Sequence, residues 1–219
     1  HKRLRALMEF AVDIGWIEVN PVGKRRPYRV SVDGYPEWPE AEIAKFHARW
    51  PRGSRQRVAF DLLLYLGQRS IDTVAMARNH IAADEHGVRR IRVVQEKTGA
   101  PLWIRLHRDL AETLDAGPLG DLYLIERQHG GPRSVKGFYN WMKAAMRDAG
   151  MAPALSPPGA RKSAATRIID IGGTSAQAAA ITGHKSIQEL ERYIKTRNQR
   201  RLADDAIDLL ERGSGGGKR

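Results

Sequence analysis

The sequence contains no cysteine, and this absence excludes three kinds of chemistry. A disulfide framework, a thiolate zinc site and a cysteine nucleophile all need a thiol that the chain does not have. A chain without thiols suits a reducing compartment, so the cytoplasm is the expected location. No apolar run approaches the roughly 18 residues that a membrane span needs, and there is no secretory hydrophobic region.

Acidic residues are scarce relative to basic ones. Asp and Glu number 25 against 37 Lys and Arg, so the 219-residue chain has a formal charge of +12. This excess predicts an anionic partner, because clustered Lys and Arg displace counterions from a phosphate backbone. Charge alone also fits a membrane surface or simple solubility, so the motifs have to identify the partner. Hydrophobic residues make up 42% of the chain, which is enough to bury a core and argues against disorder.

Two catalytic signatures are also missing. The chain has no Walker loop and no paired catalytic carboxylates, which argues against ATP-driven or metal-dependent strand cleavage. Asp204, Asp205 and Asp208 are close in sequence. Their spacing puts them on the outer face of the last predicted helix, so we expect them to be solvated and assign no metal site.

Helical periodicity dominates the sequence that is present. Between residues 88 and 106 the apolar period shortens, and the segment Lys97-Thr98-Gly99-Ala100-Pro101 separates two short runs, which predicts a β-hairpin with Lys97 at its tip. The expected fold class is mainly α with a small antiparallel β-sheet. Elsewhere the spacing of apolar residues predicts helices over 2–14, 39–50, 55–66, 134–150, 161–171, 174–183, a segment from 186, and 202–210.

A basic segment interrupts the helical pattern near the start of the chain. Asn20-Pro21 and Pro27 break the chain around four cations, and this composition is typical of a linker. The chain opens at His1 inside a helical pattern, so we expect a fragment of a longer protein. We predict a first part over 1–28, a main domain over 29–212 and a flexible Gly-rich tail over 213–219.

Five short motifs occur in a set order along the chain. They are Gly67-Gln68-Arg69-Ser70-Ile71-Asp72, Glu96-Lys97-Thr98-Gly99, Gly159-Ala160-Arg161-Lys162, Thr182-Gly183-His184-Lys185-Ser186 and Glu191-Arg192-Tyr193. Each is ordinary alone, but the ordered set resembles the tyrosine recombinases, the family of phage-type integrases. The last three also have the family's spacing, with 23 residues from Arg161 to His184 and 9 from His184 to Tyr193. The likeness covers about residues 30–212, and the opening helix looks like the end of the family's core-binding domain.

The resemblance implies a site-specific DNA recombinase that acts through a 3′-phosphotyrosine. Tyr193 would be the nucleophile, because a phenol can store the phosphodiester bond covalently. Arg69 and Arg161 would clamp the scissile phosphate, since planar guanidinium forks match its oxygens. Lys97 would protonate the leaving 5′ oxygen. This chemistry needs no cofactor.

Three further expectations complete the predicted site. The resemblance assigns His184 a contact with the phosphate, and it assigns Asp72, three residues after Arg69, the support of that guanidinium. It also implies a homo-oligomer, a tetramer on double-stranded DNA that carries an attachment site. The expected DNA contacts are Lys24, Arg25, Arg26 and Arg29 in the linker and Lys162 and Lys185 beside the motifs.

One position departs from the family's pattern. Pro158 stands three residues before Arg161, where the family usually has a histidine that helps the tyrosine lose its proton. Proline offers no side-chain donor, acceptor or proton, and the spacing of His107 and His129 does not indicate a substitute. Slower cleavage, a DNA-binding relative without activity, and a residue altered in this chain alone all fit. A type IB topoisomerase is a further alternative.

Overall fold

The computed structural model describes residues 2–22, 34–127, 129–184, 203–204, 206–208 and 210–211. The chain divides into two compact units, His1–Gly34 and Tyr35–Arg219. The predicted boundary near residue 28 falls outside the described residues. So do the predicted helix from residue 186, the tail and six predicted site residues, namely Lys24, Arg25, Arg26, Arg29, Lys185 and Tyr193.

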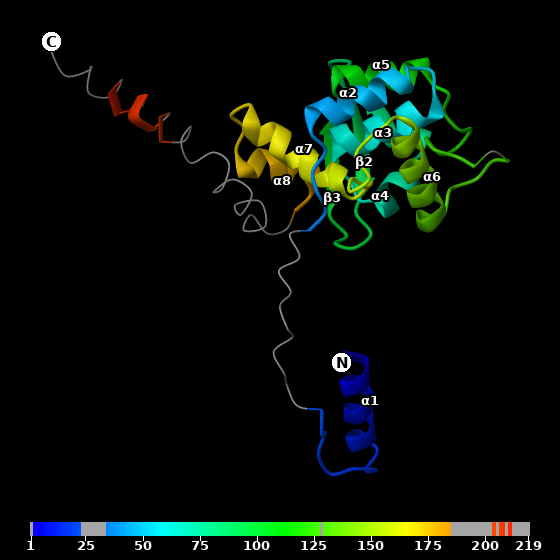
Figure 1. Ribbon diagram of the computed structural model, residues 1–219, viewed down its shortest axis with the longest axis vertical. Helices are drawn as coiled ribbons and strands as arrows, with labels where there is room; N and C mark the ends of the chain where they lie inside the picture. The colour runs from blue at the N-terminus through cyan, green and yellow to red at the C-terminus, as the bar shows by residue number, and fades with distance from the viewer. Residues whose placement is uncertain are drawn as a thin grey trace. The chain divides into compact units, whose positions relative to one another are not determined.

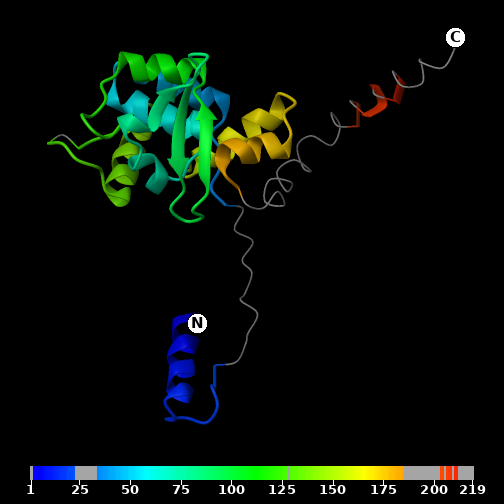
Figure 2. The ribbon, with the colours of Figure 1, turned by 180° about the vertical axis from the view of Figure 1, so that it is seen from behind.

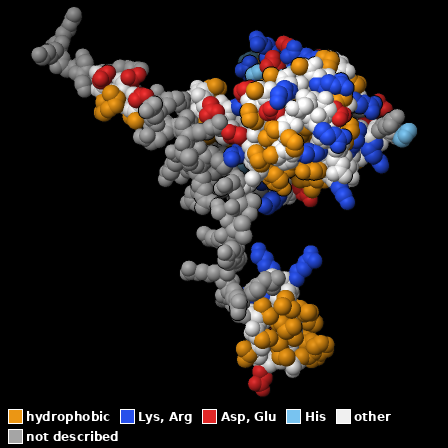
Figure 3. Space-filling view, viewed as in Figure 1, with side chains coloured by type: hydrophobic (Ala, Val, Ile, Leu, Met, Phe, Trp, Pro, Cys, Tyr) orange, Lys and Arg blue, Asp and Glu red, His pale blue; other side chains and the backbone are white. Residues whose placement is uncertain are grey.

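The first unit consists of helix α1 (Lys2–Asp13) and the turn that follows it. The predicted helix is confirmed, and Gly15 follows it in the left-handed region at φ +75°. Asn20 ties the returning chain to the helix, because its side-chain amide donates to the main-chain oxygen of Arg5 at 3.2 Å. No residue of α1 is buried in the described structure, and hydrophobic side chains gather on the surface of this unit (Figure 3).

The second unit is built around helix α3 (Arg55–Leu66), which is buried along most of its length. Ser54 caps the helix by accepting the main-chain N–H of Arg57. Apolar residues on every side of α3 allow other helices to surround it, and it packs against α4, α5, α6 and α7. Around it lie α2 (Glu40–Arg49), α4 (Ser70–Val74), α5 (Arg108–Ala116), α6 (Val135–Asp148) and α7 (Gly159–Asp170), and α8 (Ser175–Thr182) packs on α7, as Figure 1 shows.

A small antiparallel sheet lies beside these helices (Figure 2). Its strands β1 (Ile81–Ala83), β2 (Arg89–Val94) and β3 (Pro101–Arg105) are hydrogen-bonded in the order β1-β2-β3. Ile91 pairs with Ile104, and both are buried. Arg92 pairs with Trp103, which is 61% exposed on the edge strand. The predicted hairpin is confirmed, and so is the predicted fold class.

Several elements differ from the prediction. The 3₁₀ turn η1 (Arg78–His80), β1, α4 and α5 were not predicted. Helix α7 begins at Gly159, two residues before the predicted start at Arg161. The reason is Pro158, whose backbone angles, φ −61° and ψ −22°, are already helical, so the helix can begin at the next residue. The described residues within the predicted last helix, 203–204, 206–208 and 210, are helical, and so is residue 211. None of the helices in the described ranges is long and apolar enough to cross a membrane.

Candidate active site

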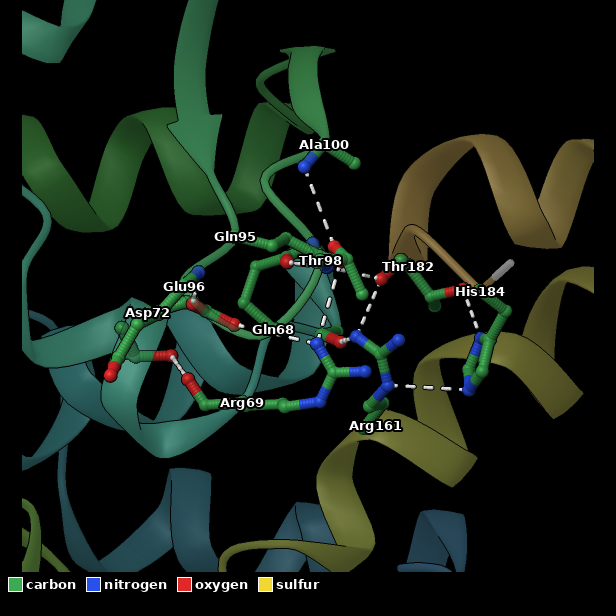
Figure 4. Close-up of polar contacts among 12 residues, drawn as sticks. Gln68, Arg69, Asp72, Gln95, Glu96, Thr98, Ala100, Arg161, Thr182 and His184 are labelled. Carbon is green, nitrogen blue, oxygen red and sulfur yellow. Dashed lines mark hydrogen bonds and ion pairs between the residues drawn. The ribbon is translucent and has the colours of Figure 1, made fainter. Parts of the chain in front are cut away.

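Four of the chain's segments meet at one place, and they carry four of the five motifs (Figure 4). Arg69 stands at the N-terminal cap of α4. Gln95 follows the last residue of β2, and Arg161 lies in the first turn of α7. His184 comes directly after Gly183, the residue that caps the C-terminal end of α8. The tertiary fold therefore brings together two predicted arginines and the predicted histidine.

The guanidinium of Arg161 is held by groups from two other motifs. Its Nη1 donates to the main-chain oxygen of Gly67 at 2.9 Å and also to the main-chain oxygen of Thr182. Its Nε donates to His184 Nε2 at 3.2 Å. Because a guanidinium is planar, these contacts set the direction of the whole fork.

The close approach that makes these contacts depends on Gly67. This residue ends α3 in the left-handed region at φ +59°. A Cβ placed here would lie 2.8 Å from both Ala164 Cβ and Thr182 Cγ2, closer than real Cβ atoms approach. Only glycine permits both the left-handed turn and the packing against α7 and α8.

Gln95 is the hub of the polar network, and sequence reasoning missed it. Its side chain is fully buried. The amide nitrogen donates to Gln68 Oε1 at 2.7 Å and to the Thr182 oxygen at 2.8 Å. The amide oxygen accepts from the Thr98 hydroxyl at 3.0 Å and from Arg69 Nη1 at 3.4 Å. The sequence did contain one signal for this residue. Side chains alternate along a strand, so a residue two positions after Val93 and four after Ile91 is expected to point inward, and at position 95 that residue is polar.

Gln68 supports this hub from the end of α3. It is 1% exposed, and its amide nitrogen donates to the Leu66 oxygen at 2.7 Å and to the Ile181 oxygen at 2.8 Å. With its oxygen accepting from Gln95, the side chain joins α3, the hairpin and α8. A buried polar group satisfied in this way stabilises one arrangement of its neighbours.

Asp72 lies beside Arg69, where the resemblance expects it, but its shorter contact is with the hairpin. Its Oδ1 accepts the main-chain N–H of Glu96 at 2.9 Å, while Oδ2 lies 3.9 Å from Arg69 Nη1. Buried Oδ2 has no hydrogen-bond partner among the described residues. Asp72 therefore holds the turn that carries Lys97 as well as providing a negative charge near Arg69.

His184 is a neutral ring at physiological pH. Burial, followed by the charges of Arg161 and Arg69, lowers the pKa of His184 from 6.5 to about 4. Its Nδ1 lies 2.6 Å from the hydroxyl of Thr182. The site thus carries its positive charge on the two arginines and leaves the imidazole uncharged between them and α8.

Lys97 lies outside this hydrogen-bonded group of described residues. Lys97 is exposed in the hairpin turn, and no hydrogen bond joins it to either arginine in the described part of the chain. Lys162, on α7, is partly buried. The predicted nucleophile Tyr193 falls outside the described residues.

One of the two histidines that the sequence left unassigned, His107, serves another element. His107 caps α5 by accepting the N–H of Asp109 at 3.2 Å, and its ring stacks on Tyr65 with centroids 4.5 Å apart. Burial and a hydrogen bond to Asp109 raise the pKa of Tyr65 to about 12, so this phenol is a poor nucleophile. This second cluster is structural.

The chemistry of the site is that of anion binding. Within the described part of the chain the Arg69 side chain makes one hydrogen bond, at 3.4 Å, and 30% of this side chain is exposed, so most of its N–H donors have no acceptor among those residues. Fixed donors of this kind stabilise negative charge that develops on an oxygen, such as a phosphoryl oxygen. No cluster of three or more His, Asp or Glu side chains that would suit a metal ion occurs in the described ranges.

Comparison with known proteins gives one match by sequence family and several by structure. Residues 40–200 match the phage integrase family. A lambda integrase (residues 75–356) dimer bound to a COC′ core site is similar, with a TM-score of 0.71 and 23% identity over 84% of this chain and 70% of that one. No curated protein matches this chain.

Two recombinases of the Xer type are also similar. The XerH recombinase bound to its difH substrate has a TM-score of 0.65 and 15% identity over 93% of this chain and 62% of that one. The XerA recombinase has a TM-score of 0.61 and 17% identity over 87% of this chain and 68% of that one. A longer lambda integrase structure is covered over 58% of its length. These likenesses show the fold.

Proposed function

The chain belongs to the phage integrase family, and on that premise we propose that it cleaves and rejoins DNA at a specific site through a covalent 3′-phosphotyrosine. The observation that carries the proposal is the convergence of Arg69, Arg161 and His184 from three separate segments. The residues between them form a buried hydrogen-bond network centred on Gln95. A site assembled in this way around two guanidinium groups suits a phosphate diester.

The two arginines would bind the scissile phosphate. Negative charge gathers on the non-bridging oxygens as the phosphorus becomes pentacovalent, and fixed guanidinium donors stabilise that charge. Arg161 is already oriented by Gly67, Thr182 and His184 in the free protein. This preorganisation lowers the cost of arranging the site when DNA binds.

Tyr193 would attack the phosphorus, and Lys97 would complete the exchange. The phenolic oxygen forms a bond to phosphorus, the bond to the 5′ oxygen breaks, and that oxygen takes a proton from Lys97 Nζ. The exposed position of Lys97 on a hairpin tip suits a group that meets the DNA. Attack by a 5′ hydroxyl of a partner strand reverses the step, so no external energy source is needed.

The DNA would be double-stranded, and basic residues outside the active site would also bind it. The linker cations Lys24, Arg25, Arg26 and Arg29, with Lys162 and Lys185 beside the motifs, would contact the flanking phosphates. Two lambda integrase structures that resemble this chain are a dimer on a core site and a tetramer on a Holliday junction. We propose the same kind of assembly, a tetramer on DNA, for this chain.

A second candidate function is DNA binding without cleavage, and Pro158 favours it. The family's usual histidine would stand here, and proline supplies no proton acceptor. Against it stands the convergence of Arg69, Arg161 and His184, since binding alone does not require two guanidinium groups oriented on one point. Type IB topoisomerase activity would appear as relaxation of supercoiled plasmid without sequence preference.

The test is a nicked suicide duplex that carries the attachment site. On a denaturing gel, wild-type protein should form a covalent adduct, and Tyr193→Phe should form none. Tyr139→Phe, a change on α6 away from the network, is the matched control and should behave as wild type. An adduct that persists in Tyr193→Phe, or no adduct in wild type with intact DNA binding, would reject the mechanism, and the second outcome would support the binding-only function.

A further inference from the structure

The contact between Arg161 and His184 determines the protonation state of the histidine ring. Arg161 Nε carries a hydrogen at any accessible pH, and it lies 3.2 Å from His184 Nε2. A ring nitrogen can accept that hydrogen bond only through a lone pair. His184 Nε2 is therefore unprotonated in the free protein, and a neutral ring must carry its hydrogen on Nδ1.

Thr182 receives that hydrogen. Its hydroxyl oxygen lies 2.6 Å from His184 Nδ1, and its own hydrogen is donated to the main-chain oxygen of Ala178 at 2.7 Å. The chain of donors runs from Arg161 to His184 Nε2, and from His184 Nδ1 through the Thr182 hydroxyl to Ala178. Every hydrogen in it has an acceptor.

The opposite arrangement breaks two of these contacts. If the Thr182 hydroxyl donated to Nδ1, the neutral ring would carry its hydrogen on Nε2, directly against Arg161 Nε–H. The oxygen of Ala178 would also lose the hydroxyl. Thr182 has no exposed surface, so water does not replace the lost partner easily. The buried hydroxyl therefore selects one tautomer.

We propose that Thr182 is a positioning residue that holds His184 neutral with an unprotonated Nε2, and that His184 accepts the proton of the nucleophile during strand cleavage. This proposal rests on the proposed function and deepens it. It assigns to His184 the proton transfer that an imidazole at position 158 would otherwise make. The phosphate contact expected of His184 would follow once Nε2 carries a proton.

The proposed step begins when the scissile phosphate accepts the Arg161 Nε–H in place of His184. The lone pair on Nε2 is then released. In the free protein the charges of Arg161 and Arg69 help to lower the pKa of His184. The bound phosphate offsets these charges, so the proton affinity of His184 rises when DNA is bound.

The atoms balance across this step. The Tyr193 Oη–H bond breaks, its proton moves to His184 Nε2, and the electron pair on Oη forms the bond to phosphorus. The bond from phosphorus to the 5′ oxygen breaks, and that oxygen takes a proton from Lys97. The strand-joining step returns both protons by the reverse path.

The experiment compares Thr182→Val, which replaces the hydroxyl by a methyl group of similar size, with Thr182→Ser, which keeps the hydroxyl. Nitrogen-15 NMR of histidine-labelled free protein identifies which ring nitrogen of His184 is protonated. Wild type and Thr182→Ser should show Nδ1–H and bare Nε2, and Thr182→Val should show a mixture. The cleavage rate of Thr182→Val on the suicide duplex should fall about tenfold or more at unchanged DNA affinity, while Thr182→Ser stays near wild type.

Each other result would overturn a named part of the proposal. Hydrogen on Nε2 in the free wild type would overturn it whole, even with full cleavage activity, and this measurement stands if Thr182→Val fails to fold. An unchanged tautomer and rate in Thr182→Val would overturn the role of Thr182. The expected tautomer with no wild-type adduct would reject the proton step together with the proposed function, whereas the wrong tautomer with a normal adduct would reject this inference alone.

Discussion

The side-chain amide of Gln95 donates to the main-chain oxygen of Thr182 at 2.8 Å, which joins the end of β2 to the end of α8 across 87 residues of sequence. The same oxygen accepts from Arg161. One carbonyl therefore connects the hairpin, α7 and α8. The position of the active-site arginines relative to each other depends on this connection.

Replacing Gln95 with leucine should disturb both stability and catalysis. The change leaves the buried Gln68 Oε1 without its partner, which costs about 1–3 kcal/mol, whereas the partly exposed Thr98 hydroxyl can turn to water. Urea denaturation should show a loss in that range, and the cleavage rate should fall by more. Gln56→Leu is the control, because that side chain makes no hydrogen bond among the described residues. Equal effects of the two substitutions would contradict the hub role.

A methyl group at Gly67 should be far more damaging than one at Gly53. Both glycines have positive φ, +59° and +89°, so alanine strains each backbone by about 1 kcal/mol. At Gly67 the methyl group also meets Ala164 and Thr182 at 2.8 Å, whereas at Gly53 nothing lies within 4 Å. Overpacking adds about 1–3 kcal/mol at Gly67. Thermal and chemical unfolding should rank the variants in this order, and similar losses would show that α7 and α8 yield to the added methyl.

His184 should make the folded state less stable as the pH falls. Its pKa is about 4 when folded, against 6.5 for an ordinary histidine, so the unfolded chain binds the proton first. The stability that the neutral ring contributes is complete above pH 6.5 and is lost as the pH falls toward 4. His184→Gln should flatten the pH dependence of the free energy of unfolding over this interval, measured in urea. Exposed His86→Gln serves as the control and should leave the slope unchanged, and a wild-type slope in His184→Gln would count against the lowered pKa.

Histidine at position 158 should matter most when His184 is missing. Pro158 has φ −61° and ψ −22°, an ordinary right-handed conformation, so histidine fits the backbone. Pro158→His should raise the cleavage rate of a His184→Gln protein markedly and change that of the otherwise wild-type protein little. Single-turnover cleavage of the suicide duplex measures both. The same increase in both backgrounds would mean that His184 does not take the proton and that Pro158 alone limits the rate.

The linker cations should contribute to the salt dependence of the affinity for DNA. If Lys24 and Arg25 each neutralise one phosphate, replacing both with alanine should lower the slope of log affinity against log salt by about 2. The loss of affinity should be similar for specific and unrelated duplexes, because phosphate contacts carry no base sequence. Fluorescence anisotropy over a salt series measures the slope, and an unchanged slope would place the linker away from the DNA.

Local patterns were sufficient to predict the longer elements except α5, which has nine residues and was missed. Helix α3 and helix α6 have apolar residues at helical spacing and capping serines at Ser54 and Ser134, so both period and boundary were visible. Strand β1 has three residues and α4 has five, too few for a period to show. These short elements take their conformation from neighbours, β1 by pairing with β2 and α4 by packing on α3 and α6.

The sequence by itself determined the identity, order and spacing of Arg69, Lys97, Arg161, His184 and Tyr193, the helical class and the basic charge. These properties are local, since composition and motif spacing are read along the chain. Only the tertiary structure decided that Gln95 links the site, that Gly67 must be glycine and that Thr182 determines the tautomer of His184. The contacts of Gln95 and Gly67 join residues far apart in sequence through hydrogen bonds and close packing, and the ring of His184 is set as much by Arg161, 23 residues earlier, as by its neighbour Thr182. A one-dimensional pattern carries no information about which distant groups become partners.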